Sequence, residues 1–189
     1  CREIKSSGIK LKFFQRINGK KTILPLPIKI SFLNGEGNFV KFKLNNSKLS
    51  HEHVYLLTKC EDSVKVTANE INLVPSLLRE FSAPVILETD LKIDEYIHLL
   101  KYDNDAYNRW DAIQNLYLDC YFNNTTVKFL SGSLRALLSD EKFDFSLMAL
   151  FLELPSINSY ENLLEIVDPI ELYLRRIEII KSITKNLQK

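Results

Sequence analysis

The feature of this sequence that most limits its fold is a change in hydrophobic period near Thr89. Before that point apolar and charged residues alternate, as in residues 9–13 and 28–32, which is the period of a half-buried strand. After it, apolar residues recur every three or four positions, which is the period of an amphipathic helix. The sequence therefore predicts an antiparallel β region followed by an all-helical region.

Turn signals about every ten residues in the first half are typical of a two-sheet, immunoglobulin- or fibronectin-like β-sandwich. The glycine- and asparagine-rich residues 34–38 predict a hairpin between the strands that flank them. Pro25 and Pro27 belong at an edge or strand start, because proline removes a ladder donor. Further strands are expected at residues 39–44, 54–57, 63–68 and 84–87.

The second half predicts a solenoid-like series of five to seven short antiparallel helices. The first spans residues 91–102 after Asp90 as N-cap, and Asp103 or Asp105 caps the second. Shorter helices are expected at residues 131–138 and at 145–152, the latter ended by Pro155. The second helix should bury one stripe, namely Ala106, Trp110, Ile113, Tyr117 and Cys120.

The strongest helix signal comes last. Asp168 as N-cap, Pro169 at the first helical position and Glu171 two residues later predict a helix that begins there. Asn158 and Glu161 have the spacing of a capping box for the helix before it. The expected apolar face of the last helix consists of Ile170, Tyr173, Leu174, Ile177, Ile180 and Leu187.

Charge also changes along the chain. Residues 1–88 carry 14 Lys and Arg against 8 Asp and Glu, whereas residues 89–189 carry 11 against 16. We therefore predict a β-sandwich domain at 1–88 and a helical domain at 89–189. The net charge of +1 argues against nucleic acid as a partner. No apolar run reaches the ~18 residues of a membrane span. Three widely spaced cysteines without a C-x-x-C pair fit a reducing compartment, so we expect a cytoplasmic protein.

Residues 51–53 (His-Glu-His) are the one cluster that resembles a metal site. Zinc peptidases place two His four residues apart on one helix face, with a Glu as general base. Here the two His lie two apart, before an expected strand, and no third ligand is evident. We interpret them as a polar strand edge and assign no catalytic, cofactor-binding or metal-binding residue.

Two stretches, residues 74–85 (VPSLLREFSAPV) and 105–112 (DAYNRWDA), carry a resemblance to a known family. Together with residues 138–144 and 167–170, they resemble the junction of the β-sandwich and C-terminal helical domains of bacterial-type aminopeptidase N, a zinc metalloaminopeptidase family. The resemblance covers nearly the whole chain. The family's H-E-x-x-H motif and its Gly-x-Met-Glu-Asn stretch are absent from this sequence.

The resemblance implies a fragment of a zinc-dependent hydrolase that releases N-terminal amino acids from peptides. Zinc and peptide substrates then belong to the parent enzyme, and this piece would be inactive alone. Its partners would be the missing catalytic domain and the rest of the helical domain, which we expect to be truncated here. Its role would be that of a spacer and chamber wall. The alternative is a stand-alone binding or scaffold module derived from such an enzyme.

Within the resembling stretches, the expected roles are structural. Phe81 is expected to be buried while Arg79 and Glu80 link neighbouring domains. Trp110, between Arg109 and Asp111, is expected to be a buried anchor, because it falls on the stripe predicted for its helix.

Overall fold

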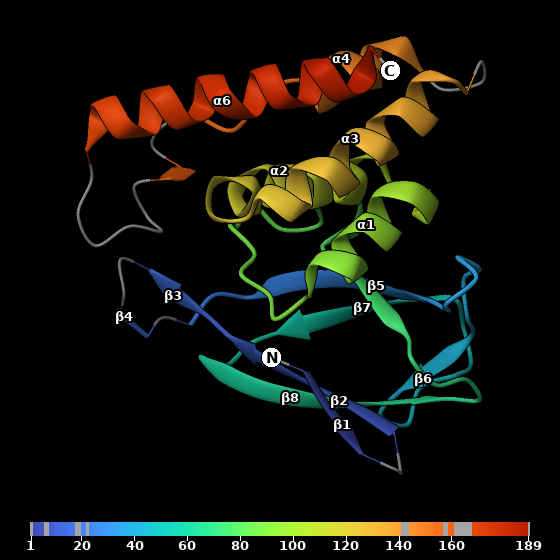
Figure 1. The fold of residues 1–189 in the computed structure, drawn as a ribbon. Helices are drawn as coiled ribbons and strands as arrows, with labels where there is room; N and C mark the ends of the chain where they lie inside the picture. Colours follow the sequence, from blue (N-terminus) through green and yellow to red (C-terminus); the bar gives the residue numbers. More distant parts are fainter. Residues whose placement is uncertain are drawn as a thin grey trace. The chain divides into compact units, whose positions relative to one another are not determined.

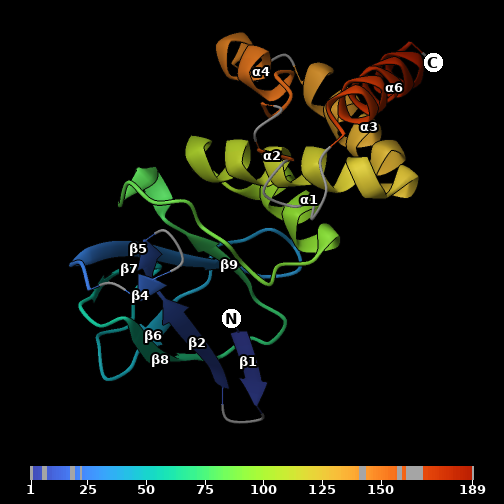
Figure 2. The same ribbon diagram turned by 90° about the vertical axis from the view of Figure 1, so that its left-hand side faces the viewer.

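The computed structural model describes residues 2–5, 8–17, 20–21, 23–140, 144–156, 159–160 and 168–188. The chain forms two compact units (Figures 1 and 2). The sheet unit contains Cys1–Lys92 and Tyr102–Asn108, and the helical unit contains Ile93–Lys101 and Arg109–Lys189. The short segment Tyr102–Asn108 therefore belongs to the sheet unit although helical residues flank it on both sides.

All strand pairs of the sheet unit are antiparallel. One sheet has the order β1-β2-β8-β6 and another the order β7-β5-β9, with β3 and β4 as a separate pair. The strands are β1 (Arg2–Lys5), β2 (Gly8–Phe14), β3 (Arg16–Ile17), β4 (Lys20–Lys21), β5 (Leu26–Leu33), β6 (Phe42–Leu44), β7 (Glu52–Leu57), β8 (Glu61–Ala68) and β9 (Val74–Leu77).

Alternating side chains of both larger sheets form one core. It includes Ile30 and Phe32 from β5, Phe42 from β6, and Val64 and Val66 from β8, all at most 1% exposed. Phe32 and Phe42 meet edge to face, with ring centroids 4.9 Å apart. Since successive strand residues face opposite sides, the polar residues between them lie outside this core. The predicted antiparallel, immunoglobulin-like region is confirmed.

One strand prediction was correct only in part, and another was wrong. Residues 34–38 do form a tight turn, with a bridge between Leu33 and Phe39, but β5 and β6 are not a hairpin, because β6 pairs with β8 in the other sheet. The chain crosses between the sheets near residue 41, so that both Val40 and Phe42 can be buried. Residues 84–87 form no strand, and β9 instead precedes them at Val74–Leu77.

Proline placement follows the donor argument. Pro27 is the second residue of β5, opposite Leu56 of β7, and β9 pairs only with the later residues Ile30–Leu33. Pro27 therefore lies where β5 has a neighbour on one side only, and its missing N–H removes no ladder bond to β9. Two residues on, the Lys29 N–H donates to the Ser82 hydroxyl at 3.0 Å.

The helical region is also confirmed. Its described helices are α1 (Ile93–Tyr102), α2 (Ala106–Phe122), α3 (Asn124–Leu138), α4 (Phe145–Phe151) and α6 (Pro169–Leu187). α3 and α6 pack side by side (Figure 1). In the part of the chain that the structure describes, no helix combines the length and apolar character that crossing a membrane requires.

Helix starts agree with the cap predictions at two of three positions. Asp105 Oδ1 accepts from the Asn108 N–H at 2.9 Å, and Asp168 Oδ1 accepts from the Ile170 N–H at 2.8 Å. The Asp90 prediction was wrong, because α1 begins at Ile93, two residues later than expected. The predicted start at residue 131 was also late, since Asn123 caps α3 at its true beginning. The capping box at residues 158 and 161 lies outside the described residues.

One predicted helix face was correct in part and the other was wrong. Ile113, Tyr117 and Cys120 of α2 are buried as expected, each at most 1% exposed. The first two residues of the expected stripe are exposed, however, with Trp110 37% exposed at the edge of the buried face. The expected face of α6 is largely exposed, and the buried residues of α6 are Leu172, Ile179 and Ile183. Periodicity identified both helices, but the direction each helix faces depends on its neighbours.

Candidate functional site

The most unusual backbone of the sheet unit follows β9 directly. Leu78, Glu80 and Phe81 have φ of 54°, 55° and 51°. The short 3₁₀ turn η1 (Arg79–Phe81) lies among them. A non-glycine residue in this left-handed region costs on the order of 1–3 kcal/mol, so the surrounding contacts must hold the turn in place.

Arg79 supplies most of those contacts, and only 7% of its surface is exposed. Its Nε donates to Glu52 Oε2 at 3.1 Å, and its Nη1 donates to Ser76 Oγ and Asp103 Oδ1, both at 2.8 Å. Its Nη2 donates to Asn104 Oδ1 at 2.5 Å. We call these five residues the Arg79 cluster. Every guanidinium nitrogen has an acceptor, as a buried arginine requires.

Lys29 and Glu80 extend the cluster into a chain of alternating charges. Lys29 Nζ lies 3.0 Å from Glu52 Oε1 and 2.7 Å from Glu80 Oε1. Hydrogen bonds to Glu80 and then to Glu52 raise the pKa of Lys29 above its ordinary value. The charges therefore run from Glu80 through Lys29, Glu52 and Arg79 to Asp103, and each cation has a carboxylate on both sides.

Strand register explains why these residues meet. Glu52 of β7 and Ser76 of β9 are both opposite Ser31 of β5, so the three side chains share one face of the β7-β5-β9 sheet. Lys29, two residues before Ser31, lies on the same face. The opposite face carries Ile30 and the core. The cluster therefore covers the outer face of this sheet.

Residues 103–105 bring the α1–α2 connection to this face. Asp103 Oδ1 also accepts from the Asp105 N–H at 2.9 Å, and Asp105 Oδ2 accepts from the N–H of Glu80 at 2.8 Å. Asp105 therefore caps α2 with one oxygen and holds the left-handed turn with the other. Among the described atoms, Asp103 Oδ2 is buried without a hydrogen-bond partner. This arrangement is a clasp between η1 and the α1–α2 connection.

The roles expected for residues 74–85 and 105–112, the two stretches that resemble the aminopeptidase N family, can now be compared with the structure. Arg79 and Glu80 do contact residues 103–105, but both sides of this contact belong to the sheet unit. Phe81 was expected to be buried and is 50% exposed, beside the Tyr107 ring with centroids 5.0 Å apart. Its positive φ points the side chain away from the direction that an extended backbone would give. Arg109 donates from Nε to the Leu100 carbonyl at 2.9 Å.

The His-Glu-His stretch does not fit a zinc site. His53 Nε2 lies 3.1 Å from the Phe42 carbonyl oxygen, which can only accept, so this nitrogen carries a proton and cannot ligate a metal. Glu52 is engaged by Arg79 and Lys29, and His51 is exposed. Within the described ranges, no three His, Cys, Asp or Glu residues come together as a metal site.

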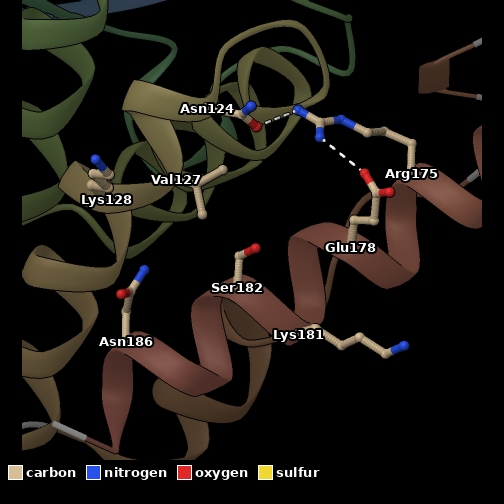
Figure 3. Close-up of a pocket in the computed structure, with 8 residues that line it drawn as sticks. All are labelled: Asn124, Val127, Lys128, Arg175, Glu178, Lys181, Ser182 and Asn186. Carbon is tan, nitrogen blue, oxygen red and sulfur yellow. Dashed lines mark hydrogen bonds and ion pairs between the residues drawn. The ribbon is translucent and has the colours of Figure 1, made fainter.

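A separate groove lies between α3 and α6 in the helical unit (Figure 3). Its volume is about 430 Å³. Arg175 bridges the two helices: it donates to Asn124 Oδ1 at 2.7 Å and pairs with Glu178 at 3.1 Å. It also donates to the Cys120 and Tyr121 carbonyls at the end of α2. Arg175 is therefore a structural link, and Lys181 extends away from the groove.

Sequence reasoning did not predict the Arg79 cluster, because Arg79 meets its acid partners 24 and 27 residues away. One signal was present. Arg79 ends a run of seven buried residues, 73–79, in which it alone is charged. A charge in such a run needs a partner. The groove between α3 and α6 had no comparable signal.

Two family models match the chain in order. A domain of unknown function (DUF3458) with an Ig-like fold matches residues 4–90. A domain of unknown function (DUF3458_C) with ARM repeats matches residues 93–189. The boundary between the two matches lies just after the change in hydrophobic period.

Curated relatives bear the name aminopeptidase N. That of Escherichia coli (strain K12) is 30% identical over 179 residues, covering 89% of this chain and 20% of the relative. That of Haemophilus influenzae is 27% identical over 161 residues, covering 79% and 18%. The chain therefore spans about a fifth of the length of these relatives.

One solved structure has the same fold over the whole chain. It is the crystal structure of Legionella pneumophila aminopeptidase A in complex with aspartic acid, with a TM-score of 0.77 and 22% identity. The match covers 100% of this chain and 22% of that chain.

Proposed function

We propose that this chain is a non-catalytic part of a longer zinc-dependent aminopeptidase. The chain belongs to the aminopeptidase N family, and it matches one family model with an Ig-like fold and another with ARM repeats. The parent would release N-terminal amino acids from peptides in the cytoplasm. One observation carries the proposal: the match to the Escherichia coli relative covers 89% of this chain, and so extends over both matched regions, but only 20% of the relative.

The proposed role of this part is that of a spacer and chamber wall. The Arg79 cluster and the neighbouring Lys29 support it, because acids of the same unit already neutralise both cations. Such a network holds a turn and a helix start in fixed geometry and offers no free positive charge to a substrate. Zinc and its ligands would come from the catalytic region of the parent. The catalytic region and the remaining helices are the proposed partners.

The test compares the 189-residue chain with the longer polypeptide encoded by the same reading frame. We expect the longer protein to hydrolyse an aminoacyl chromogenic substrate and to hold stoichiometric zinc, and the 189-residue chain to do neither. Replacing His51 and His53 by Ala in the longer protein is the matched control and should preserve activity. Hydrolysis by the metal-loaded short chain, above an unrelated protein, would contradict the proposal. A reading frame no longer than this chain would favour a stand-alone scaffold module.

The proposed domain boundary between residues 88 and 89 needs its own test. Far-UV circular dichroism of residues 1–88 should be mainly β, and that of 89–189 mainly helical. The fragment 1–88 keeps Arg79 but lacks Asp103 and Asp105, so we expect it to unfold at lower urea than the same residues in the whole chain. A helical spectrum from residues 1–88 would overturn the boundary.

A further inference from the structure

Helix α6 has two apolar faces. The first, formed by Leu172, Ile179 and Ile183, is at most 6% exposed. The second contains Ile170, Tyr173, Leu174, Ile177 and Ile180, and we call it the outer stripe of α6. At about 100° per residue, the centre of the outer stripe lies roughly 130° around the helix from that of the first face.

The outer stripe is largely open to solvent. Ile170 is 70% exposed, Tyr173 56%, Leu174 55% and Ile180 42%. Their spacing of three or four residues makes one continuous strip along the helix rather than scattered apolar side chains. Exposed apolar strips of this kind mark interaction surfaces.

The first face already has its neighbour. α3 packs against α6, and Arg175 ties α6 to Asn124 at the start of α3 (Figure 3). The outer stripe points elsewhere, because a helix cannot turn two faces separated by more than a quarter turn towards one neighbour. A helix that is apolar on two sides is typical of an inner layer of a helical assembly.

We propose that the outer stripe of α6 is the docking surface for a further amphipathic helix of the longer polypeptide, a proposal that rests on the function proposed above. The family model over residues 93–189 is one of ARM repeats, in which successive helices stack and each layer buries a face of the previous one. The matched region is 20% of the length of the Escherichia coli relative, so a further helix has a source in the same chain.

The stripe also specifies the chemistry of its occupant. The docked helix carries Leu, Ile or aromatic residues with the same three- and four-residue spacing. Lys181 is exposed at the edge of the outer stripe. It favours an Asp or Glu on the facing edge of the occupant, since opposite charges across a helix pair set its register.

The test measures accessibility in the longer polypeptide. Leu174→Cys reports on the outer stripe, and Glu171→Cys, one turn earlier on an exposed side of the same helix, is the matched control. Alkylation by a small maleimide is followed by mass spectrometry of the peptide that spans α6, so other cysteines do not interfere. In the longer protein we expect the thiol of the Leu174→Cys variant to react at least about tenfold more slowly than that of the Glu171→Cys variant. In the 189-residue chain the two thiols should react at similar rates.

The outcomes separate the possible occupants. Equal rates for the two variants of the longer protein would overturn the proposal. Slow labelling of the Leu174→Cys variant in the short chain that appears only at high protein concentration would also overturn it, in favour of a second copy. Circular dichroism verifies folding of each variant. If the longer protein hydrolyses its substrate while its Leu174→Cys variant labels fast, only the docking proposal fails. An inactive longer protein in which the same thiol is protected contradicts only the proposed function.

Discussion

The two units differ in what they leave without a neighbour. The sheet unit buries charged residues and pairs them internally, as Arg79 does with Glu52 and Asp103. Both units expose large apolar side chains, including Ile71 and Ile86 of the sheet unit. In the helical unit, however, four of them follow one another along a single helix, namely Ile170, Tyr173, Leu174 and Ile180 of α6. A buried charge requires a partner within the same fold, whereas an exposed apolar face can be covered by another segment of a longer chain. The comparison is therefore between buried charges that are paired inside the sheet unit and an aligned apolar face on one helix of the helical unit.

The comparison is tested most strongly by removing the positive charge of Arg79, which lies at the centre of the Arg79 cluster. Arg79→Ala leaves the buried Asp103 without its cation and leaves Glu52 with Lys29 alone. Breaking a buried ion pair costs about 3–5 kcal/mol. We expect a loss of that size in the free energy of unfolding, measured by urea titration. Arg79→Lys should recover only part of it, because an ammonium cannot reach four acceptors in a plane.

Arg135→Ala is the matched control, since Arg135 is exposed near the end of α3. Its cost should stay within about 0.5 kcal/mol, as for most surface substitutions. If Arg79→Ala cost no more than Arg135→Ala, the clasp would have no role in stability, and the left-handed turn at Leu78 would need another explanation.

The sequence predicted local features well and facing directions poorly. Alternation located β2, β5 and β8, and Asp168 with Pro169 located the start of α6. These signals lie within a few residues of the feature they predict. The face of α6, the partner of β6 and the cluster around Arg79 depend on residues distant in sequence. No periodicity encodes them, because the same apolar stripe can face a core, another helix or solvent.

The helix α2 tests the corrected facing direction. Leu116 is fully buried, whereas Trp110 is 37% exposed. We expect Leu116→Ala to cost about 3 kcal/mol, within the range for cavities in a core, and Trp110→Ala to cost about 1–2 kcal/mol. As the single tryptophan, Trp110 should also be quenched by iodide in the folded protein. A blue-shifted emission that iodide leaves unchanged would restore the buried-anchor interpretation.

Two helix caps sharpen the comparison at smaller magnitude. Asp168 caps α6 with an exposed side chain, and Asp168→Ala should cost about 1 kcal/mol, the usual value of an N-cap. Asp105 caps α2 and also holds the Glu80 N–H while 7% exposed, so Asp105→Ala should cost about 2 kcal/mol. Asparagine at each position keeps an acceptor oxygen and is the control. Equal costs for the two alanine variants would mean that the Asp105–Glu80 bond adds nothing.

The helical unit holds one carboxylate that opposes its stability at neutral pH. Burial raises the pKa of Asp111 to about 6, whereas the unfolded chain has its ordinary value of about 3.9. The folded state therefore binds this proton more tightly, and its stability falls as pH rises from about 4 to about 6. Asp111 stays neutral below that window and charged above it.

Asp111→Asn removes the charge while keeping the shape, so it should stabilise the protein by about 1 kcal/mol at about pH 8. This is well below the ~3 kcal/mol that two pKa units correspond to, because Asp111 is only partly buried and Asn115 Nδ2 donates to its Oδ2 at 3.3 Å. The gain should vanish near about pH 4, where the carboxyl of the folded state is protonated and that of the unfolded state is about half protonated.

Asp94→Asn, on the exposed side of α1, should give no gain at the higher pH. Urea titrations at both pH values distinguish the cases, and an Asn variant no more stable than wild type at the higher pH would mean that water reaches Asp111. Burial of the Asp111 carboxylate would then not reduce the stability of the helical unit. The contrast between this unit and the sheet unit would rest on the apolar faces alone.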